Sequence, residues 1–302
     1  MRFVTRLCIL AGVLIACAAP ALAVPVDGVL DPEYGVALST QTTQTSLGDW
    51  PPDVSHGGEL DGAFAFVADD TLHLLITCSL DRFISEPLTF PNNLQLYFDT
   101  QPGGQNVLSA ANPNVGGSIR LPGMTDLVFD TEFTPDYWIE GSRESFSSFY
   151  AYYAELPAGG GGAGYYLGAS PLSGAGVLSG GASNPYGIRA TMDISNQAGV
   201  TAGCDAASGA GVTTGAEWAI PLAAIGNPTE PFRVCALLVR PGSFGLGQVS
   251  NQSLGPMPPG TCGLGPANGV NLQNVSGAQF FVVDVTTPAV RTTWGRLKVG
   301  RR

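Results

Sequence analysis

The chain has 302 residues and a formal net charge of −11, and only 12% of its residues are charged, about half the usual share. With so few lysines and arginines it cannot neutralise many phosphate groups, which argues against nucleic acid as a partner. A hydrophobic content of 44% together with 41 glycines argues against disorder and is typical of a turn-rich extracellular β protein. The acidity favours cations or neutral polymers as partners, or simply maintains solubility.

The first 23 residues, Met1 to Ala23, are predicted to be a secretion signal. Arg2 and Arg6 form a basic start, and Leu7 to Ala16 is an apolar run that is too short to cross a bilayer. Ala21-Leu22-Ala23 is an A-x-A cleavage signal. We therefore expect a secreted chain without a transmembrane segment.

Cleavage after the signal leaves residues 24–302, which we expect to form a single domain because no linker clearly divides them. The alternative to secretion in soluble form is a lipoprotein. Leu14-Ile15-Ala16-Cys17 resembles a bacterial lipobox, in which Cys17 would carry the lipid anchor.

Four cysteines follow the leader. Cys204 and Cys262 lie in glycine-flanked loops, whereas Cys78 and Cys235 lie in strand-like runs. Pairing like with like in an oxidising compartment predicts the disulfides Cys204–Cys262 and Cys78–Cys235. The alternative for the second pair is two buried free thiols.

Short runs of strand-forming residues, separated by turns, cover most of the chain. Residues 60–68 and 71–80 read as a hairpin joined at Asp69-Asp70, and 232–239 reads as a strand that is buried on both faces. The other expected strands span 94–99, 127–129, 146–154, 189–194, 216–222, 279–285 and 292–299. Residues 241–269 are expected to be a loop, and no amphipathic helix exceeds two turns. This pattern predicts an all-β protein, an antiparallel, jelly-roll-like β-sandwich with long glycine-rich loops.

The strand 94–99 carries the clearest period-2 pattern, in which Leu94, Leu96 and Phe98 alternate with more polar residues. This alternation predicts one buried face. The strand ends at Asp99 and enters the turn Thr100-Gln101-Pro102-Gly103-Gly104. We expect an architectural role for Asp99, as a turn cap or as the donor of one oxygen to a structural cation.

An aromatic segment follows, and it supplies the candidate ligand-binding residues. Sugar rings stack on exposed aromatic planes, and their hydroxyl groups need polar partners. The alternative is that these aromatic rings fill the core and the seams under the glycine loops. The candidates are Asp136, Tyr137, Trp138, Glu140, Tyr152, Tyr153, Tyr165 and Tyr166.

Acidic residues at turns and strand ends supply a candidate metal site. Calcium takes six to eight oxygen ligands, mostly from carboxylates and turn carbonyls. The candidates are Asp27, Asp31, Asp69, Asp70, Asp99 and Glu217. The alternative is that they cap turns and keep the surface solvated.

Catalytic motifs are not evident, and we expect the protein not to be an enzyme. A glycoside hydrolase needs two facing carboxylates, which Asp130, Glu132, Asp136 and Glu140 could supply. Their spacing is not diagnostic.

Several short motifs occur in an order that resembles the family 9 carbohydrate-binding modules and the related DOMON-like sandwiches. They are Asp27-Gly28-x-x-Asp31, the strand Asp69 to Thr77, L-x-L-Y-F-D at Leu94 to Asp99, Glu217 to Leu222, and Trp294 to Val299. The stretches FDTQPGGQN and PDYW also resemble an uncharacterised group of secreted bacterial proteins. The resemblance implies an antiparallel sandwich, a structural calcium ion and a sugar site between aromatic rings. The glycine-rich insertions between residues 157 and 215 have no counterpart in that pattern.

These observations lead to a first hypothesis of a secreted, non-catalytic β-sandwich that binds a glycan or a cell-surface polymer, with structural calcium. The alternative is a structural subunit that self-associates into an extracellular layer or fibre, and a weaker alternative is an extracellular glycoside hydrolase. The segment from Tyr137 to Tyr166 is the expected location of the function.

Overall fold

The computed structural model describes residues 24–47, 58–80, 91–117, 120–196, 198–241 and 246–285. The predicted leader with Cys17, and the strand expected at 292–299, lie outside these residues. Within them, no helix is both long enough and apolar enough to cross a membrane.

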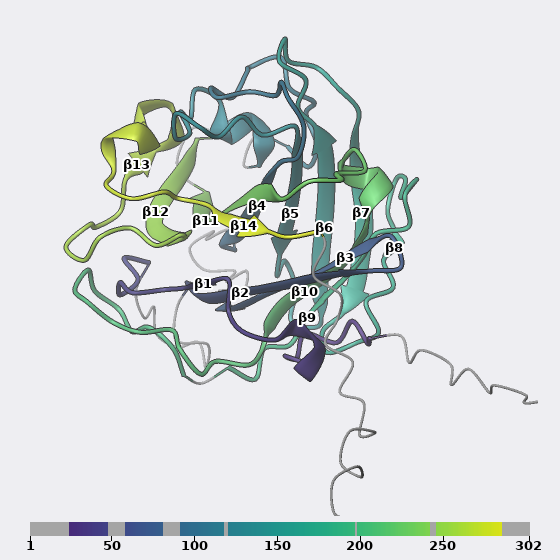
Figure 1. The fold of residues 1–302 in the computed structure, drawn as a ribbon, viewed down its shortest axis with the longest axis horizontal. Coiled ribbons are helices and arrows are strands. Elements are labelled where there is room, and N and C mark those ends of the chain that lie inside the picture. The colour runs from purple at the N-terminus through teal and green to yellow at the C-terminus, as the bar shows by residue number, and fades with distance from the viewer. Residues whose placement is uncertain are drawn as a thin grey trace, which may run out of the picture.

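The chain folds into two antiparallel sheets (Figure 1), which confirms the all-β, sandwich-like class. The smaller sheet has the order β1 (Ser39–Thr40), β2 (Glu59–Ala68), β3 (Thr71–Ser79), β10 (Gly215–Pro221), β9 (Arg189–Met192). The larger sheet has the order β13 (Gly265–Pro266), β12 (Gly247–Leu254), β11 (Phe232–Pro241), β4 (Asn93–Asp99), β5 (Tyr137–Ser142), β6 (Ser148–Glu155), β7 (Gly164–Pro171), β8 (Ser179–Gly180), and β14 (Phe281–Val283) also pairs with β11.

Helical structure in the described part of the chain is confined to single 3-10 turns. These are η1 (Pro32–Tyr34), η2 (Leu121–Met124), η3 (Leu222–Ile225), η5 (Ala267–Gly269) and η6 (Leu272–Asn274). η3 directly follows β10.

The hairpin predicted around Asp69-Asp70 is present as β2 and β3. Asp69 and Asp70 have φ angles of 49° and 54°, the left-handed conformation that a two-residue hairpin turn requires at both central positions. Aspartate tolerates this conformation better than most residues. The local sequence therefore specifies this turn.

The main core lies between the two sheets. Alternate residues of β3 point into it, among them Leu72, Leu74 and Ile76, and all three are fully buried. Trp218 of β10 packs edge-to-face on Phe149 of β6. The period-2 pattern of these strands is the direct cause, because every second side chain of a strand faces the same layer.

A second core covers the outer face of the larger sheet. Long loop segments, residues 105–135 and 256–275, supply the covering side chains, such as Phe129 and Leu272, which pack with Tyr97 and Trp138 of the sheet. The prediction of a single buried face for β4 is therefore wrong. Gln95 and Tyr97 are fully buried on the face that was expected to be polar.

The expectation of a loop at residues 241–269 is also wrong, because this segment contains β12 and β13. β12 reads GQVSNQSL and lacks apolar alternation, so its strand character depends on tertiary partners. Gln252 and Asn251 are fully buried and hydrogen-bond to the chain around Gln41 and Gln44. Buried amide side chains that are hydrogen-bonded can stabilise a strand. A search for alternating hydrophobic residues does not detect such a strand.

The disulfide Cys204–Cys262 is present and links two loops that are 58 residues apart in sequence. The predicted disulfide between Cys78 and Cys235 is wrong, since both are buried free thiols. Cys78 points into the core between the sheets, whereas Cys235 points into the core on the outer side of the larger sheet. A whole sheet therefore separates the two side chains.

Candidate binding site

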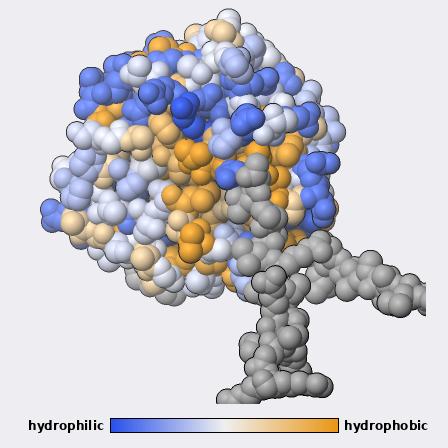
Figure 2. Space-filling view, in the orientation of Figure 1, coloured by the Kyte–Doolittle hydropathy of each residue, from blue (hydrophilic) through white to orange (hydrophobic). Residues whose placement is uncertain are grey.

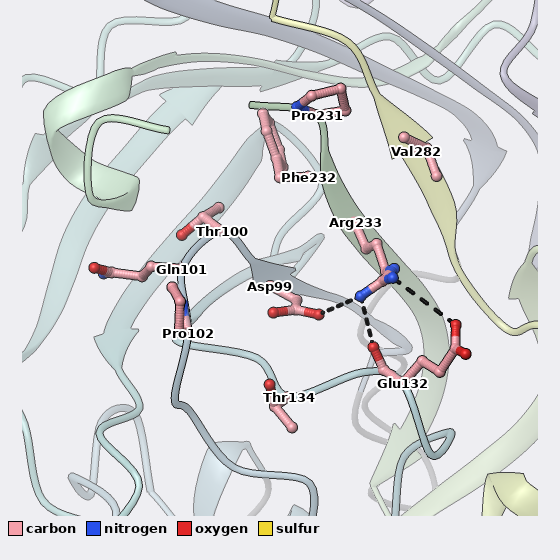
Figure 3. A pocket seen from close by; sticks show the side chains of 10 residues that line it. All are labelled: Asp99, Thr100, Gln101, Pro102, Glu132, Thr134, Pro231, Phe232, Arg233 and Val282. Carbon is pink, nitrogen blue, oxygen red and sulfur yellow. Dashed lines mark hydrogen bonds and ion pairs between the residues drawn. The ribbon is translucent and has the colours of Figure 1, made fainter. Parts of the chain in front are cut away.

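A pocket of about 510 Å³ lies where β4 and β11 reach the same end of the larger sheet. Its lining combines acidic, basic, hydroxyl, amide and apolar side chains from β4, β11, β14 and the loops between them (Figure 3). The lining residues are Asp99, Thr100, Gln101, Pro102, Glu132, Thr134, Pro231, Phe232, Arg233 and Val282.

The residues after β4, Thr100 to Gly104, form a turn that lines one side of the pocket, and we call it the pocket loop. Asp136 accepts hydrogen bonds at Oδ2 from the backbone N–H groups of Thr100 and Gln101, at 3.0 and 3.1 Å. Gly104 adopts a φ of +74°, and a Cβ there would lie 2.2 Å from the backbone oxygen of Thr134. The Pro-Gly-Gly sequence thus allows the loop to turn closely against the segment that carries Thr134.

Arg233 is the electrostatic centre of the pocket. Its Nη1 lies 3.3 Å from Oδ2 of Asp99 and donates to the backbone oxygen of Glu132 at 2.7 Å, and its Nη2 lies 3.8 Å from Oε2 of Glu132. Antiparallel pairing places Arg233 directly opposite Asp99, on the same face of the sheet. Burial raises the pKa of Asp99, and hydrogen bonds, including the one from Arg233, act against this rise.

These groups give the pocket both hydrogen-bonding and apolar surfaces. Figure 3 shows Arg233 reaching toward Asp99 and Glu132, with Thr100 and Gln101 on the other side of Asp99. Pro231, Phe232 and Val282 supply apolar surface. Val282 is 50% exposed. Such a mixture can hold a small polar molecule that also has apolar faces.

The candidate ligand residues of the aromatic segment are divided between the two faces of the larger sheet. Tyr137, Tyr153 and Tyr165 lie on the inner face, because they pack against the core between the sheets. Trp138, Glu140, Tyr152 and Tyr166 lie on the outer face or face its core. Their register on β5, β6 and β7 makes this division unavoidable, and these residues cannot form one binding surface.

Two of these rings are fully buried. Trp138 donates its Nε1–H to Oε1 of Gln95 at 2.5 Å beneath the covering loops, and Tyr153 donates its hydroxyl to the backbone oxygen of Ala224 at 2.8 Å. Their hydrogen bonds are therefore made within the protein.

On the outer face, Glu140 belongs to a buried charge cluster. Arg120 pairs with both Glu140 and Glu144, and its guanidinium lies 3.9 Å from the ring centroid of Tyr152. The Tyr152 hydroxyl donates to Oε1 of Glu144 at 3.1 Å. Glu140 and Arg120 are nearly inaccessible to solvent. This cluster fastens the loop that carries Arg120 to the sheet.

The inner face, by contrast, carries a row of tyrosines, and the first of them contacts the pocket lining at the end of the sheet. Gln101 donates its Nε2–H to the Tyr137 hydroxyl at 2.6 Å. The ring of Tyr137 is 6.4 Å from that of Tyr153, which in turn is 6.1 Å from Tyr165 and 5.6 Å from Tyr186. Asp136 and Tyr137 are thus the predicted ligand residues that lie closest to the pocket.

The six candidate calcium ligands are not brought to one place. Glu217 uses its oxygens to accept from the N–H groups of Asp27 and Gly28, both at 2.7 Å, and from the Tyr34 hydroxyl at 2.7 Å. Asp69 and Asp70 form the hairpin turn of the smaller sheet. In the described part of the chain, no three His, Cys, Asp or Glu side chains form a group suited to a metal ion. Calcium binding stays a prediction.

Asp31 lies near Asp27 and Glu33, and burial is the main cause that raises its pKa. Asp99 belongs to the other sheet and to the pocket.

The four carboxylates considered for hydrolysis are likewise separated by their contacts. Asp130 accepts from the backbone N–H of Gln279, Glu132 lines the pocket, Asp136 holds the pocket loop, and Glu140 is buried beside Arg120.

Sequence reasoning missed Arg233, Thr134 and Phe232 as parts of a site, and it considered Glu132 only as a possible carboxylate for hydrolysis. Arg233 is a basic residue at the start of an apolar strand, which is a weak local signal. The pairing of β11 with β4 places Arg233 opposite Asp99 and so makes it part of the pocket. The order of strands in a sheet cannot be read from local patterns.

Comparison of the chain with protein-family models, with curated protein sequences and with solved structures finds no match.

Proposed function

We propose that the protein is a secreted, non-catalytic β-sandwich that binds a glycan in the pocket between Asp99 and Arg233. The observation that carries the proposal is the convergence of charged, hydroxyl and amide side chains with apolar surface in one open pocket. The disulfide between Cys204 and Cys262 fits an oxidising, extracellular compartment.

Sugars are recognised by groups of this kind. Carboxylates and backbone-anchored amides can accept from and donate to sugar hydroxyls, while apolar side chains contact the CH faces of the ring. Asp99 and Arg233 orient one another, and Asp136 holds the backbone of Thr100 and Gln101. The site is therefore largely organised before a ligand enters, which lowers the entropic cost of binding.

Affinity gel electrophoresis tests the proposal. Gels containing cellulose derivatives, xylan, mannan, starch, soluble chitin derivatives or polygalacturonate would be compared for their ability to retard the protein. We expect at least one neutral polymer to retard it. Failure of every polymer would contradict the proposal.

Variants locate the binding. Asp99→Asn and Arg233→Gln each remove a charge-assisted contact, and we expect about a tenfold loss of affinity. Arg240→Gln is the matched control, because Arg240 is exposed at the opposite end of the same strand. Melting temperatures of all three variants show whether each is folded. Unchanged retardation of folded Asp99→Asn and Arg233→Gln proteins would place the binding elsewhere.

A further inference from the structure

We infer that the ligand is an extended, neutral glycan chain that crosses the end of the larger sheet, from the Asp99–Arg233 pocket over Gln101 and Tyr137 to Tyr165 and Tyr186. This inference rests on the proposed function and specifies its ligand class.

The first step is the continuity between the pocket and the tyrosines, which passes around the end of the sheet, because Asp99 and Arg233 extend from its outer face and Tyr137 from its inner face. Gln101 is exposed, lines the pocket and contacts the Tyr137 hydroxyl. Gly226, just after η3, lies against this contact, because a Cβ there would be 2.6 Å from Nε2 of Gln101 and 2.9 Å from the Tyr137 hydroxyl. The side chain of Gln101 therefore links the pocket directly to the first ring.

The second step is the arrangement of the rings. Tyr153 is buried and anchored to η3, and Tyr165 and Tyr186 pack around it. The Tyr165 ring is inclined by 20° to that of Tyr153, so the two rings are nearly parallel. Tyr137, Tyr165 and Tyr186 keep part of their surface in solvent, where it can contact the CH faces of a sugar.

The third step is the length of this surface. It starts at β11 and ends at β7, and β4, β5 and β6 lie between them. Neighbouring strands are about 4.8 Å apart, so the four spacings amount to about 19 Å. A single sugar unit covers only a fraction of that distance, whereas a chain of several units covers all of it.

The fourth step is charge. Asp99, Glu132 and Glu155 contribute carboxylates along this surface, and Arg233 is already paired with Asp99 and Glu132. The whole protein has a net charge of −11. A uronate or sulfated chain would be repelled. In Figure 2, apolar surface gathers around the position of β14, next to a polar band above it.

Calorimetric titration tests the inference with cello-, xylo- and manno-oligosaccharides from the monosaccharide to the hexasaccharide, and with oligogalacturonates of the same lengths. We expect affinity for one neutral series to increase with chain length, and oligogalacturonates to bind at least about tenfold more weakly. The Tyr186→Ala and Tyr165→Ala variants should lose about tenfold in hexasaccharide affinity and keep their affinity for the shortest ligand.

Tyr150→Ala is the matched control, because Tyr150 is a half-buried tyrosine that packs on the opposite face of the sheet. Tyr186→Phe keeps the ring and should bind like the wild type. This result would show that the loss in Tyr186→Ala comes from the missing ring and does not come from misfolding. Affinity that is independent of chain length, or equal for acidic and neutral chains, would overturn this inference while the proposed function stands. Absence of binding to every sugar would overturn the proposed function itself.

Discussion

Glu217 was a candidate calcium ligand in the sequence, but its buried carboxylate has a structural role, because it accepts hydrogen bonds within the protein. It is fully buried on β10, and its oxygens accept three hydrogen bonds that hold the N-terminal segment against the smaller sheet. One of these bonds comes from Tyr34, which packs edge-to-face on Phe66 of β2. The carboxylate thus acts as a clamp between β10 and the first described residues.

We predict that Glu217→Ala lowers the free energy of unfolding by about 3 kcal/mol or more, because three donors lose their acceptor. Urea denaturation followed by tryptophan fluorescence measures this. The control is Glu230→Ala at an exposed position, which should change stability by less than about 0.5 kcal/mol. Equal effects of the two substitutions would show that the clamp contributes nothing.

At the scale of elements, the long loops behave as parts of the fold. The loop with Cys204 runs beside the segment that follows β1, where Thr43 and Ala206 form an isolated bridge. The backbone N–H of Gly260 donates to the oxygen of Cys204 at 2.6 Å. The disulfide therefore fastens two loops that would otherwise depend on a few hydrogen bonds.

The Cys204→Ser/Cys262→Ser double variant is predicted to be less stable than the wild type by about 2–4 kcal/mol, because the bond closes a loop of 58 residues. Urea denaturation with and without reductant measures the loss. Reductant should destabilise the wild type and leave the double variant unchanged. A response of the double variant would show that the effect of reductant does not arise from this bond.

At the scale of the whole molecule, several buried carboxyl groups in different regions have a raised pKa. Burial raises the pKa of Asp61 and of Glu217 to about 7 and that of Asp136 to about 6, whereas unfolded carboxyl groups titrate near about 4. A raised pKa in the folded state means that folding favours the protonated form. The stability that this supplies is complete below about pH 4 and is lost as the pH rises through 6 to 7.

We predict that the protein melts at a lower temperature at pH 8 than at pH 5. The negative net charge adds to this trend, because self-repulsion grows as further carboxyl groups ionise. Differential scanning calorimetry at constant ionic strength measures it, and Glu217→Gln should reduce the pH dependence. A higher melting temperature at pH 8 would contradict the prediction.

The sequence by itself determined the features that depend on neighbours along the chain. Alternation predicts β3 and the inner face of β4, a continuous apolar run predicts β11, and Asp69-Asp70 predicts the hairpin turn. The glycine-rich surroundings of Cys204 and Cys262 correctly indicated loops that can approach one another. These signals are local, because side-chain direction in a strand repeats every two residues.

Only the tertiary structure decided which strands pair, and therefore where a site lies. The pairing of β4 with β11 brings Asp99 opposite Arg233 and forms the pocket, at a position that the sequence suggested to be architectural. The covering loops bury Trp138, which the sequence allowed to be exposed. Both outcomes depend on contacts between residues far apart in the chain, and a period-2 pattern contains no information about which strand or loop will lie against it.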